Sequence, residues 1–200
     1  MEKDFSERLK ELLKEINIEI DEKEVNDFYE YMTELIEWNK KINLTAITDP
    51  NDIILKHFVD CLTINKYIKN DDKVVDIGTG AGFPGIPLAI MNSKTNFTLV
   101  DSLNKRINFL NEIINKIELK NVEAVHSRAE EFGQNKLYRE KYDIAVSRAV
   151  ANLSVLLEYL LPAVKVGGKV ICMKGSQVEE EINDAKFAIK ELGGKNNIKR

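Results

Sequence analysis

The stretch VVDIGTGAGFPG, residues 74–85, decides the fold of this chain. A short apolar run leads into a glycine-rich turn, and Pro84 stands where a following helix begins. Glycines reach positive φ angles and let a ligand lie close to the backbone. Proline is accepted in the first turn of a helix, where its missing N–H has no partner to lose. Strand, glycine turn and helix in this order form the context of a nucleotide-binding turn, so the stretch predicts a Rossmann-like unit.

Strand and helix patterns alternate from this stretch towards the end of the chain. Such alternation is typical of a parallel, doubly wound α/β sheet, in which the helical crossovers are right-handed. We predict strands at 74–78, 97–101, 122–127, 142–147 and 168–174, and helices near 84–92, 104–118, 152–165 and 176–192.

The first 70 residues show a helical pattern instead. Apolar residues such as Phe5, Leu9 and Leu12 recur at helical spacing. Asp21 with Glu24 predicts a capping box, and Asp49-Pro50 predicts the start of a further helix that runs to Ile64. We therefore expect two parts: a helical segment at 1–70 and a sheet domain at 71–200.

The composition excludes several classes of protein. The chain has 200 residues, a net charge of −4, 44% apolar and 31% charged residues, which excludes disordered and collagen-like chains. Residues 1–70 hold 10 Lys and Arg against 16 Asp and Glu, and residues 71–200 hold 19 against 17. The net negative charge of the chain therefore comes from residues 1–70, whereas residues 71–200 carry a small net positive charge. We expect no transmembrane helix, no secretory signal, and no metal site from two separated Cys and two His.

Acidic residues flank the glycine turn at the expected distances. Asp76 stands two residues before the Gly78, Gly80 and Gly82 series, and Asp101 ends the second predicted strand, 21 residues after Gly80. This form resembles the first motif of class I S-adenosylmethionine-dependent methyltransferases. A carboxylate at the position of Asp101 can accept hydrogen bonds from ribose hydroxyls. NAD enzymes share this acid, and a glycine turn without a ligand is the plainer alternative.

The residue types limit the methyl acceptor. Residues 147–152, after the fourth predicted strand, do not form the [Asp/Asn]-Pro-Pro-aromatic turn of adenine amine methylation. Cys172 lies within a strand and Cys61 lies on a helix, so neither is placed as the nucleophile of pyrimidine C5 methylation. Guanine N7 already has a free lone pair, and its methylation needs positioning rather than a base.

Seven blocks together resemble the RsmG (GidB, glucose-inhibited division protein B) family. In chain order they are residues 38–47, His57 with Asp60, DIGTGAGFPGIPLAI, residues 101–106, 127–131, 147–149 and 174–175. The resemblance implies a cytoplasmic methyltransferase that uses S-adenosylmethionine to methylate N7 of a guanine in 16S ribosomal RNA of the small subunit. A small-molecule methyltransferase, a dehydrogenase and a ribosome-associated module that only holds the cofactor stay open as alternatives.

The resemblance also implies which residues bind the cofactor. Gly78 belongs to the turn, Phe83 packs on the cofactor, and Ala129 and Glu130 lie beside the adenine. Arg148 corresponds to an arginine near the methionine end, where its fork suits a carboxylate. The alternative for Arg148 is a structural ion pair with Glu130 or Asp76.

Cations of the sheet half are candidates for RNA contacts. We single out Lys105, Arg106, Arg128 and Lys174, with Arg139, Lys141 and Lys165 as further members of the set. The alternative for each is an ordinary solvated side chain. No catalytic residue is assigned: His57 is expected to pack or cap, and His126 is expected to be a satisfied core histidine.

A class I methyltransferase sheet has seven strands, and the sequence predicts five. Residues 195–200 can at most begin a sixth. We therefore expect the final β-hairpin to be missing and the sheet domain to be incomplete at its C-terminus.

Overall fold

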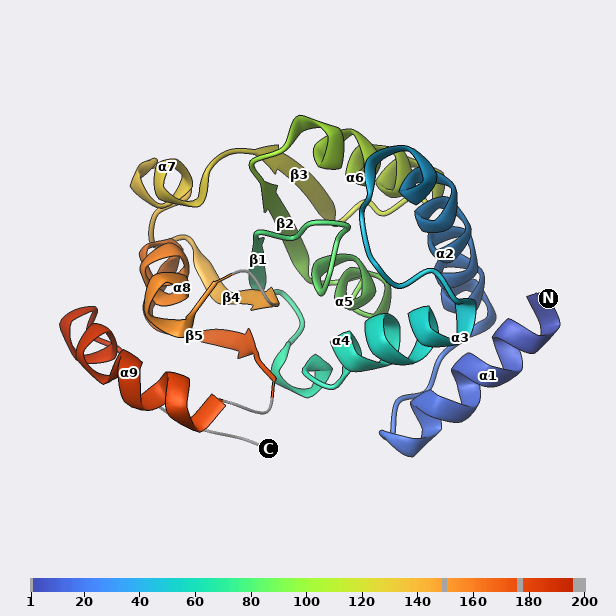
Figure 1. Cartoon of the computed structure of the whole chain (residues 1–200), viewed down its shortest axis with the longest axis horizontal. Helices are drawn as coiled ribbons and strands as arrows, with labels where there is room; N and C mark the ends of the chain where they lie inside the picture. The colour runs from blue at the N-terminus through green and yellow to red at the C-terminus, as the bar shows by residue number, and fades with distance from the viewer. Residues whose placement is uncertain (1, 149–150, 176–177, 196–200) are drawn as a thin grey trace.

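A five-stranded parallel sheet forms the centre of the computed structural model, which describes residues 2–148, 151–175 and 178–195 (Figure 1). The strand order is β3-β2-β1-β4-β5, and every neighbouring pair is parallel. The strands are β1 (Lys73–Ile77), β2 (Asn96–Asp101), β3 (Val122–His126), β4 (Tyr142–Arg148) and β5 (Val164–Met173). The predicted parallel Rossmann-like sheet is confirmed.

The chain reverses its direction of travel across the sheet between β1 and β4. From β1 it passes to β2 and β3 on one side, and β4 and β5 then continue on the other. Ile77 pairs with Val100, and Asp101 pairs with His126, so the carboxyl ends of β1, β2 and β3 share one edge. Doubly wound folds bind ligands outside this edge at such a reversal.

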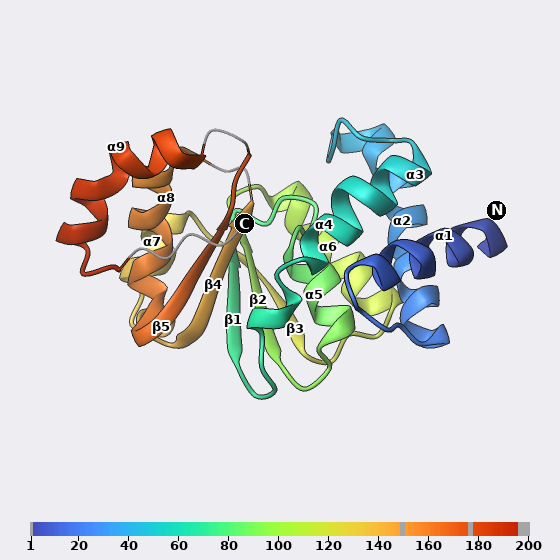
Figure 2. The ribbon, with the colours of Figure 1, turned by 90° about the horizontal axis from the view of Figure 1, so that it is seen from below.

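Helices cover both faces of the sheet, as the edge-on view shows (Figure 2). The N-terminal helices lie with α5 and α6 on one face, and α7, α8 and α9 lie on the other. The helices are α1 (Glu2–Glu15), α2 (Glu22–Ile42), α3 (Pro50–Ile53), η1 (Ile54–Val59), α4 (Asp60–Leu62), η2 (Asn65–Tyr67), α5 (Gly85–Met91), α6 (Asn104–Lys116), α7 (Ala129–Gln134), α8 (Leu153–Leu160), η3 (Leu161–Ala163) and α9 (Val178–Glu191).

Alternation along the strands divides the buried residues between the two faces. Val74 packs with Phe28 and Phe58 of the N-terminal segment in the larger core. Val75 packs with Leu156 of α8 in a smaller core on the other face. The helical segment is therefore packed directly on the sheet through shared buried side chains. The division at residue 70 stays a prediction.

Residues 50–62 form one continuous helical stretch, as the pattern after Asp49 predicts. The Asp49 carboxylate accepts a hydrogen bond from the backbone of Asp52, and Pro50 occupies the first turn. The middle of the stretch, η1, widens into a π-helix that contains His57. Such π-turns within helices occur frequently at functional sites. The capping box of Asp21 with Glu24 is also present at the start of α2.

Strand β5 begins earlier than the sequence predicts. Val164 pairs with Tyr142, and the register then shifts before Ile144 pairs with Lys169. A side chain at Gly168 would lie 2.7 Å from the carbonyl oxygen of Asp143, so this irregularity requires glycine. The prediction of helix up to residue 165 is therefore wrong: the helix ends at Leu160, and η3 leads into the strand.

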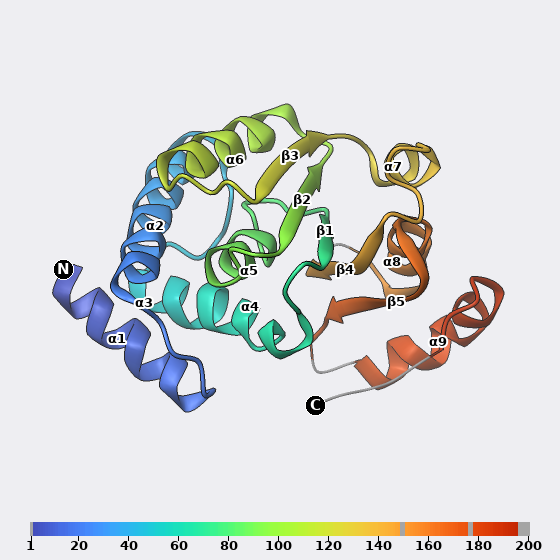
Figure 3. The ribbon, with the colours of Figure 1, turned by 180° about the vertical axis from the view of Figure 1, so that it is seen from behind.

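The C-terminal helix α9 packs on α8 beside the β5 edge, at the opposite end of the molecule from α1 (Figure 3). The first two residues of the helix predicted at 176–192 lie outside the described residues. The same holds for residues 196–200, on which the prediction of a missing hairpin rests. In the described part of the chain, no helix combines the length and the apolar character needed to cross a membrane.

Candidate cofactor and methyl-transfer site

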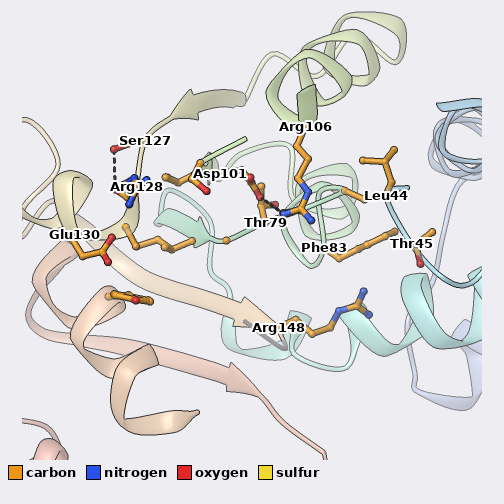
Figure 4. A pocket seen from close by; sticks show the side chains of 18 of the residues that line it. Leu44, Thr45, Thr79, Phe83, Asp101, Arg106, Ser127, Arg128, Glu130 and Arg148 are labelled. Carbon is orange, nitrogen blue, oxygen red and sulfur yellow. Dashed lines mark hydrogen bonds and ion pairs between the residues drawn. The ribbon is translucent and has the colours of Figure 1, made fainter. Parts of the chain in front are cut away.

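A cavity of about 690 Å³ lies at the carboxyl edge of the strands (Figure 4). Seven of the nine predicted cofactor residues line it: Gly78, Gly80, Phe83, Asp101, Ala129, Glu130 and Arg148. The other lining residues are Ile77, Thr79, Ala81, Val100, Ser102, Arg106, Ser127, Arg128 and Tyr159 of the sheet half, and Leu44, Thr45 and His57 of the helical segment. The structure thus brings residues from both halves of the sequence to one site.

The glycine turn forms the floor of the cavity by folding back on β2. The backbone N–H groups of Gly78 and Thr79 both donate to the carbonyl oxygen of Val100, at 2.9 and 3.1 Å. Gly80 has φ +62°, and a Cβ atom built there meets no heavy atom of the described residues within 4 Å. The turn therefore leaves space above Gly80 that only a glycine keeps fully open.

Asp76 holds the turn together from below and does not line the cavity. Its Oδ2 atom accepts hydrogen bonds from the Thr79 hydroxyl at 2.7 Å and from the backbone N–H of Gly85 at 2.8 Å. Its Oδ1 atom is buried and has no hydrogen-bond partner in the part of the chain that the structure describes. Burial raises the pKa of Asp76 to about 7, although both hydrogen bonds act in the opposite direction. Asp76 therefore supports the turn by bonding its two ends.

Gly82 also lies outside the cavity wall. It has φ +99°, and a Cβ atom there would lie 2.6 Å from Ile86 and 2.9 Å from the Tyr31 hydroxyl. The close approach of α2 to the turn thus requires glycine at this position. Gly82 serves packing rather than direct contact with a ligand in the cavity.

Asp101 presents a buried carboxylate at the end of β2. Its Oδ2 atom accepts from the backbone N–H of Gly80 at 3.0 Å and from Arg106 at 3.2 Å, and its Oδ1 atom accepts from Leu103 at 2.9 Å. A carboxylate oxygen accepts about two hydrogen bonds, so Oδ1 keeps capacity for a hydroxyl of a ligand. Arg106 neutralises this carboxylate from the cavity wall.

The segment after β3 forms one end of the cavity. Ala129 begins α7, and the backbone N–H groups of the first helical turn have no partner within a helix. Glu130 lies opposite Tyr159 of α8, and the carboxylate of Glu130 raises the pKa of the Tyr159 hydroxyl. Figure 4 shows Arg128 and Glu130 at this end, with Leu44 and Thr45 at the other.

Phe83, His57 and Arg148 pack together at the end near Thr45. The rings of His57 and Phe83 stack with centroids 4.4 Å apart, and the Arg148 guanidinium lies 4.8 Å from the Phe83 ring centre. Burial, and then the charge of Arg148, lowers the pKa of His57 to about 4. His57 is therefore packed, as expected, and it is neutral near neutral pH.

Arg148 does not form either of the ion pairs considered as alternatives. Its Nη1 atom donates to the carbonyl oxygen of Lys56 at 3.0 Å and to the Asp60 carboxylate at 3.3 Å, and Nη2 donates to Nδ1 of His57 at 2.9 Å. Arginine carries five N–H donors. Among the described residues these bonds leave the Nε–H and one Nη2–H, which suit a carboxylate in the cavity.

Comparison with known proteins identifies the fold and the family. A family model described as rRNA small subunit methyltransferase G matches residues 24–198. The Ribosomal RNA small subunit methyltransferase G of Alkaliphilus oremlandii is 54% identical over 192 residues, which are 93% of this chain and 80% of that protein. The protein of the same name from Clostridium perfringens is 51% identical over 193 residues, which are 96% and 81% of the two chains. The chain belongs to the GidB family.

Solved structures with low identity share the fold of this GidB-family protein. The ribosomal protein L11 methylase of Lactobacillus delbrueckii superposes with a TM-score of 0.58 at 16% identity, over 72% of each chain. TYW2 of P. horikoshii, solved in complex with MeSAdo, superposes with a TM-score of 0.57 at 19% identity, over 68% of this chain and 52% of that one. The class I methyltransferase fold is confirmed.

As a GidB-family methyltransferase, the protein uses S-adenosylmethionine, and the cavity fits this cofactor. The space above Gly80 is open to a ligand, and a side chain at this position would fill that space. Asp101 offers a carboxylate to ribose hydroxyls, and the N–H donors left on Arg148 suit the methionine carboxylate. No group of three or more His, Cys, Asp and Glu side chains in the described ranges could hold a metal ion.

The cations predicted to contact RNA differ in where they lie. Arg128 is exposed and lines the cavity, and Lys105 is exposed next to Arg106 in the sequence, whereas Arg106 itself is bound to Asp101 in the cavity wall. The Lys174 side chain is only 9% exposed, and its ammonium binds Glu181 and the carbonyl oxygen of Ala151, so it is directed inward. Arg139, Lys141 and Lys165 precede or begin β4 and β5, at the opposite edge of the sheet; Lys165 is bound to Asp143 there.

The expectation for His126 is wrong in one respect. The residue is satisfied, because Nε2 lies 2.9 Å from the carbonyl oxygen of Ser102, but it is exposed rather than in the core. β3 is one of the two edge strands, and it is less buried than the inner strands β1 and β2. The strand order of the sheet decides which strands lie at its edges, and the local sequence around His126 does not predict that order.

Several cavity residues were not predicted from the sequence as site residues. Thr79 and Ser102 adjoin predicted residues, and Ser127 lies in a block that carries the family resemblance. Leu44 and Thr45 lie in the first such block, and this position in a family block is the sequence feature that could have indicated them as site residues. Tyr159 lies within the apolar pattern of α8, and nothing in its neighbours indicates that it faces a cavity.

Proposed function

We propose that this protein transfers the methyl group of S-adenosylmethionine to N7 of a guanine in 16S ribosomal RNA of the small subunit. The relatives at 54% and 51% identity bear the name Ribosomal RNA small subunit methyltransferase G. Identity at this level, over more than nine-tenths of the chain, supports the same substrate for this protein.

The observation that supports N7 is that the described residues lining the cavity provide no base at the end near Thr45 and Arg148. Among the described lining residues, the carboxylates are Asp101 and Glu130, and neither lies beside Thr45 and Arg148. His57 is near, but both ring nitrogens are engaged, Nδ1 by Arg148 and Nε2 by Thr45. A site without a base suits an acceptor that needs no deprotonation. Guanine N7 is such an acceptor because it carries a free lone pair in the neutral base.

Binding and orientation are then the main tasks of the chain. S-adenosylmethionine, when bound, supplies a methyl group that is activated by the positive charge on its sulfur. Gly78 and Gly80 provide the close backbone approach, Asp101 holds the ribose, and the segment at Ala129 and Glu130 lies beside the adenine. Arg148 binds the carboxylate, and Phe83 forms an apolar wall. Positioning of this kind can contribute about 7–11 kcal/mol to lowering a barrier.

The substrate also implies a location and a partner surface. A protein that modifies the small ribosomal subunit acts in the cytoplasm. Arg128 is exposed at the cavity and Lys105 is exposed at the start of α6, so both can contact RNA phosphates, which dominate the affinity of proteins for nucleic acids. The acidic helical segment completes the cavity through Leu44 and Thr45.

The proposal is tested by offering competing acceptors. The protein is incubated with S-adenosylmethionine carrying a tritiated methyl group and with small ribosomal subunits that lack the modification, free 16S ribosomal RNA, or a mixture of small metabolites. We expect the label in 16S ribosomal RNA in at least one of the first two reactions. Label in small molecules alone would show a small-molecule methyltransferase, and cofactor binding without any transfer would show a module that only holds the cofactor.

A further inference from the structure

Thr45 is held more rigidly than its place in a loop suggests. The side chain of Asn39 binds its backbone twice: Nδ2 donates to the carbonyl oxygen of Thr45 at 2.9 Å, and Oδ1 accepts from its N–H at 2.8 Å. Thr45 lines the cavity beside Phe83, at the end where Arg148 lies (Figure 4). Its position is therefore fixed by the end of α2 and not by a ligand.

The protonation of His57 follows from its neighbour Arg148. Arginine has no acceptor atom, so in the 2.9 Å contact between Nη2 and Nδ1 the ring nitrogen must accept. A neutral imidazole then carries its proton on Nε2. Nε2 lies 2.9 Å from Oγ1 of Thr45 and donates to it.

The hydroxyl of Thr45 consequently has only its proton left to offer. Its oxygen accepts from Nε2 of His57 and from the backbone N–H of Ile47, at 2.9 and 3.1 Å. A hydroxyl has two acceptor lone pairs and one donor, so both lone pairs are used. Among the described residues, no hydrogen bond uses the proton. Thr45 thus acts as a hydrogen-bond donor, and its donor role is set by the series of hydrogen bonds that runs from Arg148 through His57.

A donor of fixed polarity distinguishes between purines. On the edge that carries N7, guanine presents N7 and O6, which are both acceptors, whereas adenine presents the N7 acceptor and the N6 amino donor. A donor beside N7 therefore favours guanine and opposes adenine. Asp60 and the carbonyl oxygen of Lys56 hold Arg148 on its other side. The donors and acceptors in this series of hydrogen bonds therefore cannot exchange roles while Arg148 stays in place.

We propose that the Thr45 hydroxyl donates a hydrogen bond to O6 of the target guanine and thereby selects guanine over adenine. The inference rests on the proposed function. Asn39, His57 and Arg148 are positioning residues for this bond. The other possible acceptor in the cavity is the carboxylate of the cofactor, and the experiment separates the two.

The experiment pairs a change in the protein with a change in the base. The variants are Thr45→Val, which keeps the shape and removes the donor, and Thr45→Ser, which keeps the hydroxyl. The methylated position is first located with the wild-type protein. Small subunits are then reconstituted with guanine or with 2-aminopurine at that position, since 2-aminopurine keeps N7 and lacks O6. Affinity for S-adenosylmethionine is measured separately by calorimetry.

We expect Thr45→Val to bind S-adenosylmethionine like the wild type and to lose about 5- to 100-fold in kcat/KM on guanine. On 2-aminopurine the two proteins should be nearly equal, because the bond is absent from both. Thr45→Ser should stay close to the wild type on guanine. If Thr45→Val does not fold, Thr45→Ala takes its place in the same comparison.

Three results would overturn the inference. The first is an equal kcat/KM for wild type and Thr45→Val on guanine, and the second is an equal loss on both bases. The third is a loss of cofactor affinity that accounts for the whole effect, which would assign the hydroxyl to the methionine carboxylate. A wild-type protein that leaves small subunits unmethylated would instead contradict the proposed function itself.

Discussion

The hydroxyl of Tyr31 donates a hydrogen bond of 2.6 Å to the carbonyl oxygen of Ala81. Tyr31 lies in α2 of the helical segment, and Ala81 lies in the glycine turn of the sheet half, 50 residues further along the chain. The Tyr31 ring is fully buried and stacks on Phe58. The helical segment therefore supports the floor of the cofactor site directly.

Replacement of Tyr31 by Phe should loosen the glycine turn. The ring keeps its packing, but the carbonyl oxygen of Ala81 is left buried without its donor, which costs about 1–3 kcal/mol. We expect a lower free energy of unfolding in urea and a several-fold weaker affinity for S-adenosylmethionine by calorimetry. Tyr29→Phe, in the same helix, is the control. Loss of stability with unchanged affinity would mean that the bond supports only the fold.

A side chain at Gly80 should exclude the cofactor. A Cβ atom there enters open space in the cavity, and the φ angle of +62° strains any other residue. Gly167 has φ +85° and equally open space, but it lies outside the cavity lining and so provides a matched control. We expect both Gly80→Val and Gly167→Val to lower the melting temperature. Affinity for S-adenosylmethionine should fall by about 100-fold or more only in Gly80→Val. The valine side chain would occupy space that the cofactor needs, which costs more binding free energy than the loss of a single hydrogen bond.

If the Gly80 and Gly167 variants bind the cofactor equally well, the turn is not the binding site. That outcome would remove the main support for the assignment of Gly78 and Asp101 as well.

Asp76 should make stability depend on pH in a direction unusual for an aspartate. Burial raises its pKa from 3.8 to about 7 in the folded protein. The folded state therefore binds more protons than the unfolded state between these values. The contribution of Asp76 is fully present below about pH 4 and is lost as pH rises through about 7.

Asp76→Asn tests this dependence. The amide oxygen can still accept from Thr79 and Gly85, and no buried charge forms. The free energy of unfolding of the variant relative to the wild type should therefore rise between pH 5 and pH 8, as denaturant titrations at each pH would show. A constant difference would mean that the pKa of Asp76 is not raised. Asp76→Ala should be less stable by about 1–3 kcal/mol for each donor left unpaired.

Arg148→Ala should weaken cofactor binding by about 1.5–3 kcal/mol, the range for a hydrogen bond to a charged group. The expected cause is the loss of the two N–H donors that Arg148 does not use within the described protein. Asp60→Asn weakens the ion pair on Nη1 and leaves those donors in place. Calorimetry should show a much smaller loss for Asp60→Asn. Equal losses would mean that Arg148 acts only through its contact with Asp60.

The sequence predicted those parts of the site that depend on local pattern. Gly80 and Asp101 are fixed by their spacing from β1 and β2, and the sheet follows from the alternation of strands and helices. Arg148 was predicted as a cavity residue only through the family resemblance. Its position at the end of β4 predicts that it lies at the carboxyl edge of the sheet, but it does not predict which residues Arg148 contacts.

The partners depend on segments that meet only in the folded protein. Asp60 and His57 lie 88 and 91 residues before Arg148. The π-helical widening of η1 that contains His57 leaves no mark in the apolar pattern. The inward direction of Lys174 likewise depends on Glu181 of α9, which no spacing rule connects to it. These contacts decide the polarity of Thr45 and the set of cations that remain for RNA.

The most direct measurement identifies the nucleoside that receives the methyl group. Small subunits lacking the modification are treated with S-adenosylmethionine that carries a deuterated methyl group, and the 16S ribosomal RNA is digested and analysed by mass spectrometry. The expected result is label in 7-methylguanosine at a single position, and its disappearance with Gly80→Val but not with Gly167→Val. Label in any other nucleoside, or its absence from 16S ribosomal RNA under conditions where the cofactor binds, would contradict the proposed function.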